Sequence, residues 1–335
     1  MAERRTGQMS LGEGTVVAAS SSNEVLERVA ALVAWAPVEA LLHDLRSGPM
    51  GAPGYPALMM FKALLLQRWY VLSDPALEEA LKDRLSFRRF IGVSLSDPIP
   101  DHSTLWRFRE AMGDGRSAAV FAQIGTQIEA SGFVLKQGTL IDASLVPAAV
   151  NPPPPPSDGE LPPDADGRPA SKLVRSAHDG DAAWTSKNGQ RHFGYKLHVG
   201  MDQASRIIRR QMLTPANVND TVVADALICG DEAMVYADKA YDTHARSERL
   251  AELGIANGIM HRPSKWHRLT PDETERNARL ARTRGAIEPI FSLFKNVYGF
   301  TRARYRGLRR NAAAFTLAAI AMNLKRWARC QPATA

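Results

Sequence analysis

The sequence changes character at Gly138, and this change restricts the fold more than any other feature of the chain. Before it, apolar side chains recur at the three-to-four-residue spacing of amphipathic helices. After it come short β-rich segments bounded by glycine, proline or helical stretches. A chain of 335 residues is long enough for two domains. We therefore predict a helical domain over residues 23–135 and an α/β domain over residues 136–329.

Helix start signals divide the first part. Pro56 suits a first helical turn, the run Ser73-Asp74-Pro75 combines a cap with a proline, and Asp101 offers another cap. We expect a disordered, polar N-terminus over residues 1–22. Helices are predicted over residues 23–46, 57–72, 73–90, from 101 onward, and 117–131.

The second part predicts a mixed sheet. Strands are expected over residues 139–146, 191–202, 206–213, 233–238 and 255–261, and helices over 221–229, 243–253, from 271 onward, and 311–329. Three strands close in sequence favour antiparallel pairing, and the later strands, separated by helices, favour parallel crossovers. This order predicts a ribonuclease-H-like, five-stranded mixed sheet with flanking helices. Residues 150–175 are rich in proline and predict a flexible surface insertion.

Charge indicates the class of partner. The chain carries a net charge of +7. The segment from Arg276 to Arg329 holds thirteen lysines and arginines and one acid, Glu288. A basic balance of this kind favours a polyanion or an acidic membrane surface. Two cysteines are too few for a disulfide framework or a cysteine zinc site. With no apolar leader segment and no spanning run, we expect a cytoplasmic protein.

Three carboxylates stand at positions suited to chemistry. Asp142 lies within the first predicted strand, Asp238 ends the fourth, and Glu288 lies in the late basic helix. Adjacent parallel strands would bring the two aspartates together, and a helix on the sheet could add the glutamate. Carboxylate oxygens suit Mg²⁺ or Mn²⁺, and two such ions can serve phosphoryl transfer. The simpler alternatives are a turn or cap role for each aspartate, and an ion pair between Glu288 and Arg284.

The chain resembles bacterial insertion-sequence transposases of the DDE type, in the group that includes insertion-sequence family five. The similarity covers residues 23–329 and rests on residues 72–74, 84–90, 140–144, 192–198, 214–217, 236–241 and 288–295. The late family motif is tyrosine, two residues, arginine, three residues, glutamate, six residues, lysine. Arg284, Glu288 and Lys295 fit this spacing, whereas Ala281 stands at the tyrosine position.

The resemblance implies an enzyme that cleaves the ends of its element and joins the 3′-OH to target DNA. Asp142, Asp238 and Glu288 would be the catalytic residues and would hold two Mg²⁺ ions. The helical part would be a DNA-binding and dimerisation domain, and double-stranded DNA and a second copy of the chain would be the partners. Two alternatives stay open from the sequence: a nuclease of the same fold that cuts without joining, and an inert DNA-binding relative.

Candidate DNA contacts lie in both parts. Near the carboxylates, Lys196 and His198 are predicted on the polar face of a strand, with a solvated face as the alternative. Asn217 orients a ligand or shapes its loop. Trp106, Arg107 and Arg109 could form a recognition helix, for which core packing of the tryptophan is the alternative. The full set of predicted DNA-binding residues is Lys196, His198, Lys239, Arg284, Lys295, Arg302, Arg304, Arg306, Arg309, Arg310, Arg107 and Arg109.

Two helix breakers flank the glutamate. Gly285 and Pro289 bracket Glu288, and proline disfavours helical geometry in the residue before it. We therefore predict a kink or a helix start at Glu288 in place of a straight helix over residues 271–299.

Overall fold

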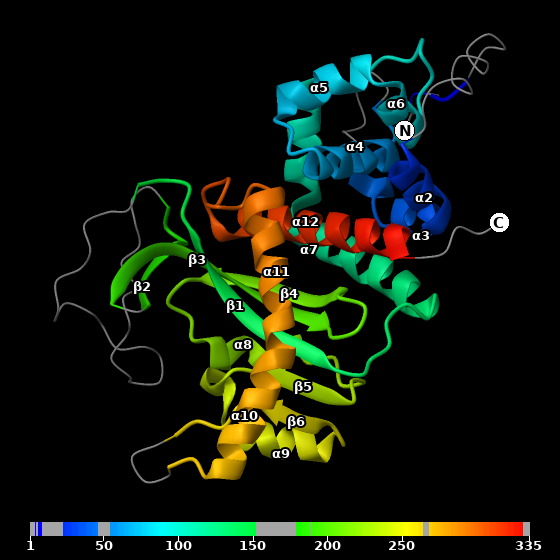
Figure 1. The fold of residues 1–335 in the computed structure, drawn as a ribbon. Coiled ribbons are helices and arrows are strands. Elements are labelled where there is room, and N and C mark those ends of the chain that lie inside the picture. The colour runs from blue at the N-terminus through cyan, green and yellow to red at the C-terminus, as the bar shows by residue number, and fades with distance from the viewer. Residues whose placement is uncertain are drawn as a thin grey trace. The chain divides into compact units, whose positions relative to one another are not determined.

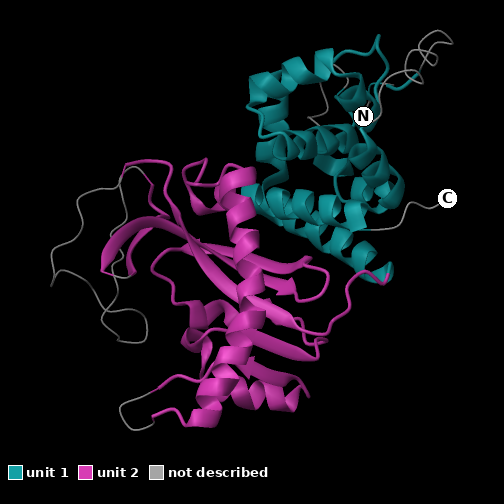
Figure 2. Ribbon diagram, in the orientation of Figure 1, with its two compact units in different colours: residues 1–131, 313–335 teal, residues 132–312 magenta. Residues whose placement is uncertain are grey.

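The computed structural model describes residues 4, 6–8, 23–45, 54–151, 179–187, 189–263 and 268–330. The chain forms two compact units (Figure 2). Unit 1 comprises residues 1–131 and 313–335, and unit 2 comprises residues 132–312. The limits differ from the expected domains at the C-terminus, because residues from Ala313 onward cluster with unit 1. Apart from residues 4 and 6–8, the N-terminus predicted to be disordered lies outside the described residues, and so do residues 152–175 of the proline-rich insertion.

The regular elements described in unit 1 are helices. They are α2 (Glu24–Leu32), α3 (Trp35–Ala40), η1 (His43–Leu45), α4 (Ala57–Trp69), α5 (Asp74–Asp83), α6 (Leu85–Ile91), α7 (His102–Ala130) and the larger part of α12 (Leu308–Cys330). Two predicted helices are interrupted: Val33 and Arg84 are extended, so each of these helices becomes two. The predicted break before residue 117 appears at Gly113, which interrupts α7. No described helix is both long and apolar enough to cross a membrane.

Unit 2 is built on a six-stranded mixed sheet (Figure 1). Its strands are β1 (Thr139–Pro147), β2 (Ala183–Lys187), β3 (Gln190–Asp202), β4 (Ile208–Pro215), β5 (Met234–Ala237) and β6 (Ala256–Ile259). As predicted, the early strands pair antiparallel: β3 pairs with β1, β2 and β4. The later strands pair parallel, β1 with β5 and β5 with β6.

The prediction of five strands is wrong by one strand. β2 begins eight residues after the end of the proline-rich insertion and has only five residues, of which two are buried. A segment so short and so polar gives almost no periodic signal. β2 pairs with the first five residues of β3, and Lys187 is the last residue of β2.

Helices cover both faces of this sheet. The remaining helices of unit 2 are α8 (Asp220–Leu227), η2 (Lys239–Tyr241), α9 (His244–Glu252), α10 (Pro271–Arg284), η3 (Gly285–Ile287), α11 (Glu288–Ser292) and η4 (Leu293–Val297). Ile141 on β1 packs with α8, α9 and the inner side chains of β5 and β6. Successive strand residues face opposite ways. Asp142, the next residue on β1, therefore lies on the face that α10 and α11 cover (Figure 1).

The double cover corrects one prediction. The strand residues Lys196 and His198 were expected on a polar face, but His198 is fully buried and Lys196 is nearly so. The side of β3 that carries them faces α8, where a glycine, Gly200, lies against Leu227. The alternation of apolar and polar residues in β3 therefore does not indicate a solvent-exposed face. Both faces of the strand are covered, and one of them contains a polar network.

The helix start predicted at Glu288 is confirmed. α10 ends at Arg284, a 3₁₀ turn spans Gly285–Ile287, and a new α-helix begins at Glu288. Glu288 keeps right-handed helical dihedral angles, with φ −56° and ψ −41°. The break is therefore a local tightening of the helix and not an extended residue.

Candidate active site

Parallel pairing sets the two aspartates side by side. Thr139 pairs with Val235 and Leu140 with Tyr236 on β1 and β5. Carried two residues further, this register puts Asp142 opposite Asp238, on the same face of the sheet. Burial raises the pKa of Asp142, and the nearby charge of Asp238 adds to this rise.

Each aspartate is oriented by its own backbone. The amide of Ala143 donates to Oδ1 of Asp142 at 2.8 Å, and the amide of Ala240 donates to Oδ1 of Asp238 at 2.8 Å. Asp238 thereby caps the 3₁₀ turn η2. One carboxylate oxygen of each residue accepts this local bond, and the other oxygen of Asp142 faces Arg284 on α10.

Arg284 links the first aspartate to the glutamate. Its Nη1 donates to Oδ2 of Asp142 at 2.8 Å, and its Nη2 lies 3.9 Å from Oε1 of Glu288. The bond to Asp142 is between two largely buried side chains, whereas the side chain of Glu288 is 69% exposed. The Arg284–Glu288 ion pair foreseen as the simple alternative thus exists, but the shorter bond of Arg284 goes to Asp142.

The carboxylates fit a divalent cation. Burial raises the pKa of Asp142, and Arg284 opposes this rise. A largely buried carboxylate requires a positive partner, and the guanidinium between Asp142 and Glu288 shows that a cation is accommodated there. The donor set is oxygen only, which is the set that Mg²⁺ and Mn²⁺ prefer. These are the residues that would hold such an ion.

Two lysines give the site a cationic border. Lys187, at the end of β2, opposes the rise that burial causes in the pKa of Asp142. Burial lowers the pKa of Lys295, and the charge of Lys187 lowers it further. Neither lysine has an acidic partner within ion-pair distance in the described part of the chain. Two uncompensated lysines at one site suit an anionic ligand. Sequence reasoning included Lys295 but missed Lys187, because β2 itself gave no signal.

A buried polar network lies on the opposite face of the sheet. Nζ of Lys196 is 2.8 Å from Oδ1 of Asp220 and donates to the carbonyl of Val218. Nε2 of His198 pairs with Oγ1 of Thr214 at 2.9 Å, and burial lowers the pKa of His198 to about 4. These contacts leave Lys196 and His198 facing the interior, which corrects their prediction as DNA contacts.

Tyr241 lies within electrostatic reach of both Asp220 of this network and the two aspartates. It is 1% exposed, and its hydroxyl has no hydrogen-bond partner within the described residues. Burial raises the pKa of Tyr241 strongly, and the carboxylates of Asp220, Asp142 and Asp238 add to the rise. Sequence reasoning quoted Tyr241 within a family motif but gave it no role. Asn217, a further candidate, has a buried Oδ1 without a partner in the described part of the chain.

Among the predicted contacts in unit 1, Arg109 is placed in the interior. Arg109 is 6% exposed and donates to both carboxylate oxygens of Asp74, at 2.6 and 2.8 Å. A buried guanidinium with two such bonds serves the packing of α5 on α7, so its predicted DNA contact is wrong. Its neighbours differ: Trp106 is 46% exposed, and Arg107 is exposed on the same helix and bonded to Ser103.

The arginine strip of residues 302–310 is anchored at its start. Arg302 donates twice to the carbonyl of Ala148, at 3.0 and 3.2 Å, and Arg304 lies over the ring of Phe300. The strip stays at the surface, with Arg306, Arg309 and Arg310 exposed, and Lys239 beside Asp238 is exposed as well. Because these side chains are exposed, their predicted contacts with a DNA phosphate backbone stay predictions.

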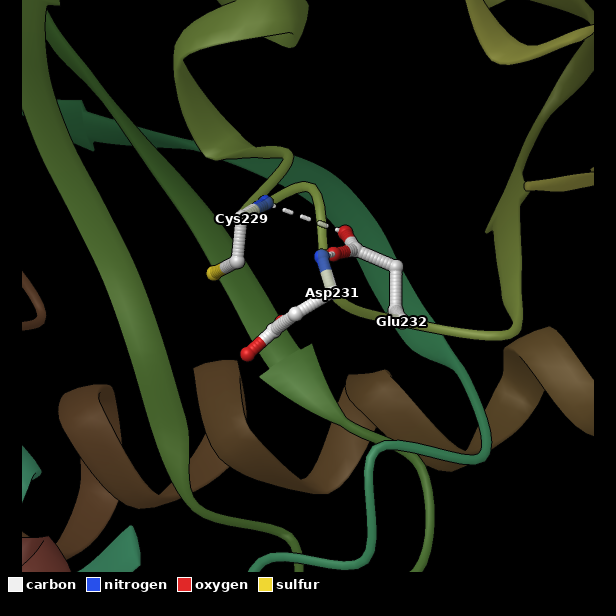
Figure 3. A group of neighbouring side chains, drawn as sticks. All are labelled: Cys229, Asp231 and Glu232. Atoms are coloured by element: carbon white, nitrogen blue, oxygen red, sulfur yellow. Dashed lines mark hydrogen bonds between the residues drawn. The ribbon is translucent and has the colours of Figure 1, made fainter. Parts of the chain in front are cut away.

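A second group of metal-ligand side chains lies elsewhere in unit 2 (Figure 3). It consists of Cys229, Asp231 and Glu232, whose ligand atoms lie within 4.8 Å of one another. Glu232 accepts three backbone N–H bonds from residues 229–231, and Asp231 pairs with Lys136 and Arg209. Both carboxylates are therefore already satisfied, so the group shapes a loop.

Comparison with known families gives two matches along the chain. A family model described as "Transposase domain (DUF772)" matches residues 16–111. A second model, described as "Transposase DDE domain", matches residues 135–324, which is more than half of the chain and includes Asp142, Asp238 and Glu288.

Proposed function

Because the chain belongs to the family of DDE transposases, enzymes that act on DNA, we propose that it cleaves the ends of its own insertion sequence and joins the freed 3′-OH to target DNA. We further propose a ribonuclease-H-like catalytic fold and membership of the group that includes insertion-sequence family five. The strand order of unit 2, with parallel pairing confined to β1, β5 and β6, supports the fold proposal.

One observation carries the assignment of the site. The β1–β5 register sets Asp142 beside Asp238, and Arg284 connects Asp142 to Glu288. Three carboxylates that are 50 to 146 residues apart in sequence are thus connected through one strand register and one guanidinium. A surface ion pair between Arg284 and Glu288 would not require the two aspartates to be there.

The proposed roles follow from this geometry. Asp142, Asp238 and Glu288 would hold two Mg²⁺ ions, which would activate the attacking oxygen and stabilise the negative charge on the leaving oxygen in phosphoryl transfer. The Oδ1 bonds from Ala143 and Ala240 fix how the two aspartates point. Lys187, Lys295 and the arginine strip bind phosphates and position the DNA strand against the carboxylates. Cleavage and joining use water and the 3′-OH as nucleophiles, so no side chain forms a covalent intermediate.

DNA cleavage and joining by purified protein test this function. The substrate is a labelled linear DNA that carries the sequences flanking the gene on both sides, with a supercoiled plasmid as target. We expect Mg²⁺-dependent 3′-OH ends and labelled plasmid products. Asp142→Asn, Asp238→Asn and Glu288→Gln should each reduce both products by at least about 10³-fold. The exposed Asp272 of α10 supplies the matched control, Asp272→Asn, which should retain activity.

The products distinguish the alternatives. Cleaved ends without joined plasmid, even from pre-cut DNA, would indicate a nuclease of the same fold. Binding of the flanking DNA without any cleavage would indicate an inert relative. Full cleavage by Asp142→Asn would show that the catalytic carboxylates are assigned wrongly. Since two element ends have to be brought together, we propose that the active complex is a homodimer on DNA, which cross-linking with and without DNA can measure.

A further inference from the structure

A long-range hydrogen bond connects the β3–β4 hairpin to the segment just before Glu288. Nη1 of Arg206 donates to the carbonyl of Ala286 at 2.5 Å, across 80 residues of sequence. Ala286 is the middle residue of the 3₁₀ turn η3, and Glu288 starts the next helix. We propose that Arg206 is a positioning residue for Glu288, an inference that rests on the proposed catalytic role of that glutamate.

The helix needs such support because its own hydrogen bonds are interrupted there. Pro289 has no N–H, so the α-helical bond to the carbonyl of Gly285 is absent. The amide of Glu288 donates to the carbonyl of Gly285 instead, which is the bond of a 3₁₀ turn. A 3₁₀ turn has poorer hydrogen-bond geometry than an α-helix. The position of Glu288 is therefore set in part from outside its own helix.

The hairpin that carries Arg206 is held firmly. The fully buried carboxylate of Asp202 accepts from the amide of Lys136 and from both the amide and the hydroxyl of Ser205. The amide of Gln203 donates to the carbonyl of Gly138, one residue before β1. The hairpin is thus fixed to the start of β1, the strand that carries Asp142. Through Arg206, the position of Glu288 is therefore tied to the same strand as Asp142.

The backbone of Arg206 supports a specific requirement for this geometry. Arg206 has φ +62°, the left-handed region that residues other than glycine seldom adopt. Such residues persist where the surrounding structure determines their conformation, and they concentrate at functional sites. In this conformation the amide of Arg206 bonds to the carbonyl of Asp202, and the side chain reaches η3.

The test uses a substitution that keeps the backbone and removes the reach. Arg206→Asn suits the left-handed conformation but is too short to contact Ala286. Arg206→Lys retains a donor of similar length, and Arg249→Ala, on the exposed side of α9, controls for loss of a positive charge. Three quantities are measured on the full chain: amide hydrogen exchange over residues 285–292, Mn²⁺ affinity by calorimetry, and kcat and KM for DNA cleavage.

Arg206→Asn should speed exchange over residues 285–292 by about 10-fold and weaken Mn²⁺ binding by about 10 to 100-fold, the usual effect of losing support behind a metal ligand. Its kcat should fall by a similar factor with KM for DNA unchanged, and Arg206→Lys should recover most of each loss. Normal exchange and Mn²⁺ affinity in Arg206→Asn would overturn the proposal, as would a change in KM alone, which would make Arg206 a DNA contact.

The exchange and Mn²⁺ measurements need no DNA. If the unaltered protein failed to cleave DNA, the proposed function would be lost, while faster or unchanged exchange in Arg206→Asn would still decide whether Arg206 orders the start of α11.

Discussion

Replacing the buried histidine of β3 should remove a large part of the acid sensitivity of the protein. His198 is fully buried, and burial lowers its pKa from 6.5 to about 4, against an upward influence of Asp220. The unfolded chain therefore binds a proton at this residue more readily than the folded protein does. Unfolding takes up that proton between about pH 6.5 and pH 4, so the free energy of unfolding must fall as the pH falls through this range.

The magnitude follows from the two pKa values. A difference of about 2.5 units corresponds to about 3 kcal/mol when the pH lies well below 4. Between pH 7.5 and pH 5, where the folded protein keeps the ring neutral, the same pKa values give a loss of about 2 kcal/mol. Glu78 and Asp101 contribute outside this interval. Hydrogen bonds from Lys82 and Ser103 respectively lower their pKa values to about 2, so their contribution is lost only below about pH 4.5.

Urea unfolding at pH 7.5 and pH 5 measures the effect in His198→Gln. Glutamine can place its amide where Nε2 of His198 meets Thr214, but it does not titrate. Between pH 7.5 and pH 5, the free energy of unfolding of the variant should therefore fall by about 2 kcal/mol less than that of the unaltered protein. His244→Gln is the matched control, because the ring of His244 is exposed on α9 and its loss should change stability by no more than about 0.5 kcal/mol. If His198→Gln lost as much stability as the unaltered protein between the two pH values, the buried histidine would not be the cause.

Three further predictions concern cations in the two units. Arg109→Met should lower the free energy of unfolding by about 2 to 4 kcal/mol in urea, because Asp74 is left unpaired, while DNA affinity of the folded protein stays the same. Lys187→Ala and Lys295→Ala should each reduce the slope of log K against log salt by about 1 in fluorescence anisotropy with DNA; unchanged slopes would exclude both as phosphate contacts. Arg284→Gln should tighten Mn²⁺ binding without DNA by about tenfold in calorimetry, because the guanidinium competes for Asp142; equal affinity would contradict this.

The part of the site that was predictable from sequence is the part that strand order determines. Asp142 lies in a strand bounded by Gly138 and Pro147, and Asp238 ends a strand flanked by helices. Parallel neighbours end at the same edge of a sheet, so the position of each aspartate along its strand predicts the pair. Glu288 was located by its charge and by the flanking breakers Gly285 and Pro289, both of which act locally.

The parts that could not be predicted depend on contacts between distant segments. Lys187 reaches the site only because five residues after the proline-rich insertion pair with β3. The alternating pattern of β3 predicts a solvent-facing His198, but α8 covers that face of the strand and buries the side chain. Arg109 resembles a DNA contact until Asp74, 35 residues earlier, binds it. In each case the residue type is compatible with two environments, and the choice is made by an element far away in the sequence.

The 3₁₀ turn before Glu288 explains why Arg284 can bind Asp142 as well as approach the glutamate. In a continuous α-helix, residues four apart lie about 40° from one another around the axis and form a direct pair. Three residues wound at about 120° each, as in a 3₁₀ turn, in place of about 100°, turn Glu288 by about 60° more and move it about 1.5 Å further along the axis. The extra rotation is consistent with the 3.9 Å separation of Arg284 from Glu288 and with its shorter, 2.8 Å bond to Asp142. The 3₁₀ turn thus leaves a long Arg284–Glu288 ion pair, while Arg284 makes its shorter bond to Asp142 on β1.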